Sequence, residues 1–143
     1  MKIAIVKVRG RRNLSPRIAK TLELLNLERT NNCVVIEDTP QNMGMVQVCK
    51  DYITYGPIGE KTLFELLRKR GEKGGRRLRE VMEEEEIKQA ANKIMHEEKV
   101  QNFADPVFRL HPPGKGYKNI KKPAPEGDLG RRNEMDSLVK KMM

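Results

Sequence analysis

The sequence predicts an α/β protein of two layers, in which short strands alternate with short helices. Two runs rich in β-branched residues, Ile3–Val8 and Cys33–Ile36, indicate buried strands. Ser15-Pro16 and Thr39-Pro40 each supply a helix N-cap followed by a proline suited to the first turn. Hydrophobic residues make up 37% of the 143 residues, which allows one small core.

The spacing of apolar residues predicts the helices that follow the two Ser/Thr-Pro pairs. The first helix carries its apolar residues every three to four positions, as one stripe. A second helix is expected over residues 41–51. Residues 53–56 are rich in strand formers, and because Pro57 lacks an N–H, a short edge strand is expected there.

A third helix completes a first unit over residues 1–77. Thr62 and Glu65 have the spacing of a capping box that starts this helix, and Gly71 is placed to end it. The order is then β-α-β-α-β-α, with helices on one face of a small sheet. This unit is expected to form the core of the domain.

The remaining chain is expected to pack onto the same compact domain. Residues 78–102 are predicted to form an acidic helical insertion, with helix over 78–99 and Glu83–Glu86 facing solvent. Residues 103–143 are predicted to contain a strand at 107–110, a basic Pro/Gly-rich arm and a terminal helix.

The charge of the chain is segregated along it. The formal net charge is +9, from 29 Lys and Arg against 20 Asp and Glu. It divides into +8 over residues 1–77, −3 over 78–102 and +4 over 103–143. Such an excess favours a polyanionic partner, nucleic acid or acidic membrane. The basic stretches lack interleaved bulky apolar residues, which disfavours membrane. No run approaches the ~20 apolar residues of a membrane span, and a cytosolic protein is expected.

Few residues could support catalysis or bind a metal. His96 and His111 have no third ligand at useful spacing, so no metal site is expected. Cys33 and Cys49 fall on predicted apolar faces and are expected to be buried and inert. Gly56–Thr62 departs from the phosphate-binding loop pattern because Glu60 separates its second glycine from the lysine. No cofactor, small-molecule substrate or enzymatic activity is expected.

The basic clusters are the strongest functional signal. The loop after the first strand holds more guanidinium groups than nearby carboxylates can pair, since the nearest acid in sequence after it is Glu23. Its residues are Arg9, Arg11, Arg12, Asn13 and Arg17. A second cluster comprises Arg68, Lys69, Arg70, Lys73, Arg76 and Arg77. A third comprises Arg109, His111, Lys115, Lys118, Lys121, Lys122, Arg131 and Arg132. With aromatic residues at only 4%, phosphate and shape recognition of folded RNA is favoured over base stacking.

Several segments together resemble one known family. They are residues 3–6, 15–16, 34–40, 42–45, 53–56, 108–113 and 126–130. The combination resembles large-subunit ribosomal protein thirty, called protein seven in eukaryotes, in its longer archaeal and eukaryotic form. The resemblance implies a ferredoxin-like core, no catalysis and a place on large-subunit rRNA. It also implies that the second helix contacts RNA, here through Gln41, Asn42 and Lys50.

The expected partners are therefore the 23S rRNA, with the 5S rRNA as a candidate neighbour, and adjoining large-subunit proteins on the ribosome. The alternative is a free-standing RNA-binding or RNA-processing accessory protein of the same fold. The acidic segment 78–102 agrees least with the family and is expected to be a solvent-facing helix that balances charge.

Overall fold

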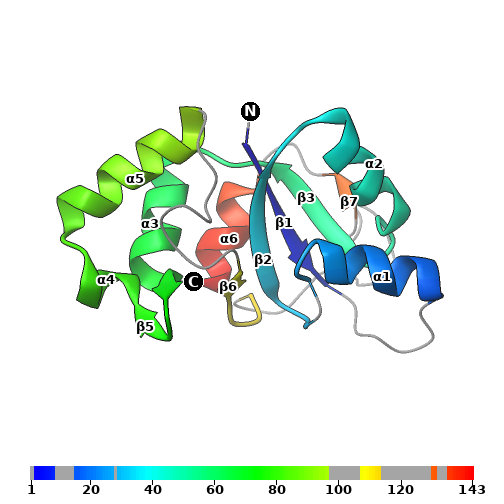
Figure 1. Cartoon of the computed structure of the whole chain (residues 1–143), viewed down its shortest axis with the longest axis horizontal. Helices are drawn as coiled ribbons and strands as arrows, with labels where there is room; N and C mark the ends of the chain where they lie inside the picture. Colours follow the sequence, from blue (N-terminus) through cyan, green and yellow to red (C-terminus); the bar gives the residue numbers. More distant parts are fainter. Residues whose placement is uncertain (1, 9–14, 28, 97–106, 114–129, 132–134) are drawn as a thin grey trace.

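The computed structural model describes residues 2–8, 15–27, 29–96, 107–113, 130–131 and 135–143. Its main sheet has the strand order β6-β2-β1-β3-β7, and a separate two-stranded ribbon joins β4 to β5 (Figure 1). The strands are β1 Lys2–Lys7, β2 Asn32–Glu37, β3 Ile53–Pro57, β4 Glu72–Lys73, β5 Arg76–Arg77, β6 Phe108–Arg109 and β7 Gly130–Arg131. The helices are α1 Pro16–Leu24, α2 Pro40–Val48, α3 Glu60–Arg70, α4 Leu78–Val81, α5 Glu84–His96 and α6 Asp136–Met142.

Strand β1 lies at the centre of the sheet. It pairs antiparallel with β2 on one side and with β3 on the other, so that Ile5 lies opposite both Val34 and Tyr55. All six residues of β1 are buried, including Lys2, which pairs with Glu37 at 3.4 Å. Strand β6 extends the antiparallel sheet beyond β2. The α/β class and the strand at 107–110 are confirmed, the latter as the two residues of β6.

The prediction that residues 53–56 form an edge strand is wrong. Strand β3 pairs with β1 on one side and, in parallel, with β7 on the other, where Thr54 lies opposite Gly130. The Thr54 hydroxyl also donates to the Gly130 carbonyl oxygen at 3.1 Å. Pro57 does mark the end of the strand, but Gly130, 76 residues after Thr54, covers the open edge.

The two connecting helices of the β-α-β-α-β core cover one face of the sheet, as predicted. Alternate residues of the central strands point to that face, where Ile3, Ile5 and Val34 pack against Leu22 of α1 and Val46 of α2. Figure 1 shows α1 and α2 together on the right of the sheet. Cys49, the residue that follows α2, is fully buried in the same cluster.

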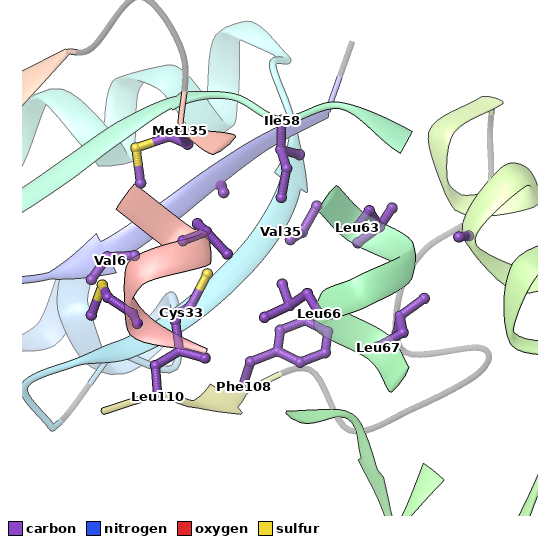
Figure 2. Packing of buried hydrophobic residues seen from close by; sticks show 14 of the residues in the cluster. Val6, Cys33, Val35, Ile58, Leu63, Leu66, Leu67, Phe108, Leu110 and Met135 are labelled. Atoms are coloured by element: carbon purple, nitrogen blue, oxygen red, sulfur yellow. The ribbon is translucent and has the colours of Figure 1, made fainter. Parts of the chain in front are cut away.

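The third helix lies on the opposite face, which the prediction of a single helical layer did not include. Ala4, Val6, Cys33 and Val35 form that face of the sheet. Figure 2 shows Leu63 and Leu66 of α3, Phe108 of β6 and Met135 before α6 packed around it. The reason is that β1 and β2 are apolar on both sides, so each face needs its own cover.

The helix predicted over residues 78–99 is broken. Helix α4 ends at Val81, Met82 is extended with φ −125° and ψ 146°, and α5 begins at Glu84. Leu78 and Ile87 explain the break, since both are buried in the same cluster. At 100° per residue, nine positions would place these two side chains on opposite faces of one continuous helix. The exposed position of Glu83–Glu86 is confirmed.

Local capping signals locate two helix starts and misplace a third. The Ser15 hydroxyl accepts from the Ile18 N–H at 3.4 Å, and the Thr39 hydroxyl from the Asn42 N–H at 3.2 Å. The predicted capping box at Thr62 is wrong, because α3 begins at Glu60 and Thr62 is a buried residue inside it. The cap of α3 comes from elsewhere in the chain.

The terminal helix is confirmed as α6. Its apolar stripe, which comprises Met135, Leu138, Val139 and Met142, is buried in the cluster shared with α3. This stripe therefore serves core packing in the chain itself. Most of the predicted arm lies outside the described residues.

Candidate nucleic-acid interface

The predicted site residues on the α1–α2 side of the sheet include two exposed cations. Arg17 lies in the first turn of α1, and Lys50 lies two residues beyond the end of α2. Neither side chain forms an ion pair with any residue that the structure describes. By contrast Lys20, on the same helix as Arg17, is paired with Glu23 at 3.9 Å.

The topology brings Lys50 to the end of the sheet where β1 ends. The Val8 N–H donates to the Tyr52 carbonyl oxygen at 2.9 Å, which joins the turn after α2 to the residue that follows β1. In Figure 1 the C-terminal end of α2 descends toward α1. Lys50 therefore lies two residues from a backbone contact with Val8, the residue that follows β1.

The other two residues assigned to the second helix lie at its opposite end. Gln41 and Asn42 are in the first turn of α2, six to seven residues before Val48, which at 1.5 Å per residue puts them about 10 Å from the end of the helix. Gln41 is exposed. The Asn42 side-chain nitrogen donates to the Glu37 carbonyl oxygen at 3.0 Å, so its amide fastens α2 to the end of β2.

The third cluster does not come together as one patch in the part described. Arg109 lies in β6 and Arg131 in β7, which are the two outer strands of the main sheet. With about 4.8 Å between neighbouring strands, four spacings separate them by roughly 19 Å. His111 is exposed near Arg109, whose guanidinium lies 3.6 Å from the Glu72 carboxylate.

Many of the predicted contacts lie outside the described residues. These are Arg9, Arg11, Arg12, Asn13, Lys115, Lys118, Lys121, Lys122 and Arg132. Their assignment to RNA remains a prediction.

The second cluster surrounds the end of α3 and the β4–β5 ribbon. Two of its arginines are used to hold the chain together. Arg70 donates from Nε and Nη2 to the Met143 carbonyl oxygen at 3.2 and 2.7 Å, and Arg77 donates to the Lys69 carbonyl oxygen at 2.9 Å. Lys69, Lys73 and Arg76 are exposed.

The buried cysteines are unsuited to nucleophilic chemistry. Burial raises the pKa of the Cys33 thiol to about 12, against a smaller opposing effect of a hydrogen bond with the Ile5 backbone. Burial likewise raises the pKa of Cys49 to about 11. Both thiols are therefore protonated at neutral pH, and the thiolate is the reactive form.

In the segment Gly56–Thr62, which departs from the phosphate-binding loop pattern, a carboxylate of the chain itself occupies the helix N-terminus. The Gly59 N–H, at the N-terminus of α3, donates to the Asp136 carboxylate at 3.0 Å. The structure has strand β3 through Pro57, a two-residue link at Ile58 and Gly59, and α3 from Glu60, so this segment is not a phosphate-binding loop. Among the described residues, no three His, Cys, Asp or Glu side chains gather as metal ligands would. No described helix has the length and apolarity that crossing a bilayer demands.

The fold and the exposed cations define a small basic α/β protein. Residues 3–53 match the family model for ribosomal protein L30p/L7e. The chain is 42% identical to the large ribosomal subunit protein uL30 of Archaeoglobus fulgidus, with 97% of this chain and 98% of that protein covered. It is 41% identical to uL30 of Methanococcus maripaludis over the full length of both, and 39% identical to uL30 of Methanosphaera stadtmanae, with 98% of this chain and 99% of that protein covered.

The chain belongs to the ribosomal protein L30p/L7e family. The membership confirms the resemblance drawn from the sequence and its archaeal type, and it makes the chain a structural protein rather than an enzyme. Because the similarity extends over the whole chain, it includes the second basic cluster and the acidic segment, which lie beyond the 3–53 match.

Proposed function

We propose that this protein binds large-subunit rRNA as a structural component of the large ribosomal subunit. It recognises the phosphate backbone and the shape of folded RNA. The observation that carries the proposal is the contrast on α1: Lys20 has a carboxylate partner in the chain, whereas Arg17 is exposed and unpaired among the described residues. Unpaired cations on a fixed backbone are suited to phosphate oxygens and have no intramolecular ion pair to break before they meet them.

The scaffold supports the proposal in a second way. Helices α1 and α2 are fixed by an apolar cluster that includes Leu22 and Val46, both essentially fully buried. The backbone that carries Arg17 on α1, and the end of α2 that leads to Lys50, are therefore held in place. Neutralising phosphates where RNA helices approach each other would offset their repulsion and release bound counterions.

The test compares Arg17→Ala/Lys50→Ala with the matched control Lys20→Ala. Affinity for large-subunit rRNA is measured by filter binding between 50 and 200 mM salt. Wild-type affinity should fall by about 10³-fold over this range if six or more phosphates are contacted. The double variant should reduce the slope of log K against log salt by about 2, one for each lost phosphate contact. Lys20→Ala should leave the slope nearly unchanged.

All three side chains are exposed, so the melting temperatures should stay close to the wild-type value. Equal slopes for the double variant and the control would contradict the assignment of Arg17 and Lys50. A salt-independent affinity would contradict phosphate recognition altogether.

Assembly is tested by sedimentation. The proposal predicts that the protein remains with large subunits through a high-salt wash, in contact with rRNA and adjoining proteins. Complete loss from the particles, with RNA binding retained, would favour the free-standing accessory protein.

A further inference from the structure

The β4–β5 hairpin carries an electrostatic conflict that the fold does not resolve. Lys73 and Arg76 are direct cross-strand partners on either side of Gly74-Gly75. Side chains so paired lie on the same face of the ribbon with Cβ atoms about 5 Å apart, where like charges destabilise the pairing. Both residues are exposed, and neither forms an ion pair with a described residue.

No acid among the described residues forms an ion pair with either side chain, and acids are few along this part of the chain. Residues 68–79 contain seven Lys and Arg and one acid, Glu72. The Glu72 carboxylate is engaged by Arg109 at 3.6 Å. Beyond the hairpin, the nearest acidic group along the chain is Glu80, on α4.

The hairpin is also held rigidly in position. Arg77 donates to the Lys69 carbonyl oxygen, and the Leu78 N–H donates to the Gly71 carbonyl oxygen at 2.8 Å. Gly74 and Gly75 both have positive φ, 60° and 85°, as a two-residue turn of this kind requires. The fold thus fixes two like charges side by side at an exposed tip.

We infer that the β4–β5 hairpin, with the end of α3, is a second RNA-binding surface that contacts an rRNA segment different from the one at α1 and α2. This inference rests on the proposed function. Phosphate oxygens of an RNA backbone lie close enough together to be shared by the Lys73 and Arg76 side chains, which turns their repulsion into binding.

The position of the hairpin makes the surface separate from the first. Helix α3, from which the hairpin continues, covers the face of the sheet opposite α1 and α2. In Figure 1 the ribbon and α4 lie at the lower left, whereas α1 and α2 lie at the right. A protein with cations on both sides can hold two RNA segments together.

The acidic first turn of α5 limits this surface on one side. The hollow between α3 and the α4–α5 corner is lined by Lys69 and Arg79 but also by Glu83 and Glu84. Arg68 also lines the hollow, so the two carboxylates offset two of its three cations. This side therefore attracts phosphates less than the hairpin does, and the RNA is expected to follow the hairpin and the end of α3. The acidic segment then has a role in directing the RNA, besides balancing charge.

The test uses two exposed apolar residues as attachment points for an iron chelate that cleaves nearby RNA by hydroxyl radicals. Val81, at the end of α4, is 50% exposed, and Leu24, at the end of α1, is 61% exposed. Val81→Cys and Leu24→Cys proteins are labelled and bound to large-subunit rRNA. The native thiols are buried and protonated, so they are not labelled.

Cleavage from both positions, at different rRNA segments, is the expected result. Cleavage from Leu24→Cys alone overturns the inference, leaves the proposed function intact and points to an acidic protein at the hairpin. Cleavage of one common segment from both positions also overturns it. Absence of cleavage from both overturns the inference and the proposed function together.

A charge-matched comparison gives an independent readout. Lys73→Ala/Arg76→Ala should lower the slope of log K against log salt by about 2, and cleavage of rRNA from Val81→Cys should weaken when the two changes are added to it. The control Lys88→Ala/Lys93→Ala removes the same charge from exposed residues of α5. Equal slopes for the two double variants would mean that only net charge matters, which overturns the inference.

Discussion

The Asp136 carboxylate caps a helix that lies 77 residues away in the sequence. It accepts the Gly59 N–H at 3.0 Å, at the N-terminus of α3, where Gly59 itself has no side chain to serve as a cap. The preceding residue, Met135, donates its N–H to the Pro57 carbonyl oxygen at 3.0 Å. The start of α6 is thereby joined to the start of α3, and a negative charge is placed at the positive end of a helix dipole.

Replacing Asp136 by Ala should lower the free energy of unfolding by about 1–2 kcal/mol, the usual cost of a lost cap. Urea denaturation followed by circular dichroism measures it. Asp136→Asn keeps a side-chain oxygen as acceptor and loses only the charge, so its loss should be smaller. If both variants were as stable as the wild type, the hydrogen bond to Gly59 would contribute nothing to stability.

This long-range cap explains where sequence reasoning about the fold succeeds and fails. Helices α1 and α2 have caps within three residues, at Ser15 and Thr39, and both starts are predicted correctly. Helix α3 has a tertiary cap, which no local pattern reveals, and Thr62 is mistaken for its start. The same holds for β7, since two residues, Gly130 and Arg131, carry no periodicity that predicts pairing with β3.

Sequence patterns likewise predict only part of the candidate RNA-binding site. Composition and spacing predict clusters of cations, but only coordinates show which are already engaged. Arg70 and Arg77 donate hydrogen bonds to backbone oxygens of their own chain. Arg109 lies 3.6 Å from the Glu72 carboxylate, whereas Arg17 makes no ion pair with the described residues. The like-charge pair of the hairpin depends on strand register, which sequence reasoning did not predict over residues 73–77.

Gly71 is required by the close approach of the chain to itself. A Cβ at this position would collide with the Leu67 carbonyl oxygen, which already accepts the Gly71 N–H. Gly71→Ala should therefore lower the free energy of unfolding by about 1–3 kcal/mol, as overpacking does. Gly44→Ala is the matched control, since Gly44 lies in α2 with open space around it. That change should raise stability by about 0.5–1 kcal/mol through helix propensity. Thermal unfolding of the two variants should shift in opposite directions, and equal shifts would contradict the collision.

Arg70 anchors the end of α6 through two hydrogen bonds to one carbonyl oxygen, that of Met143. Lysine keeps the charge but cannot present two nitrogens in the same plane. Arg70→Lys should therefore speed amide hydrogen exchange in α6 by about tenfold, equivalent to ~1.4 kcal/mol, while exchange in α1 stays unchanged. Native-state exchange read by mass spectrometry or NMR measures both helices. Faster exchange in both alike would indicate global destabilisation rather than a local anchor.

The buried Cys33 thiol gives the protein a defined sensitivity to alkaline pH. Burial raises its pKa from 9.0 to about 12, so the folded state keeps the proton while the unfolded state releases it above pH 9. The contribution to stability is fully present below pH 9 and is lost as the pH rises toward 12, at up to about 1.4 kcal/mol per pH unit. Cys33→Ala removes this group, whereas the Lys, Tyr and Cys49 titrations remain in both proteins. Between pH 9 and 11 the free energy of unfolding of the wild type should therefore fall more steeply than that of Cys33→Ala. Urea titrations across this range measure the two slopes, and parallel profiles would mean that Cys33 ionises as readily in the folded protein as in the unfolded chain.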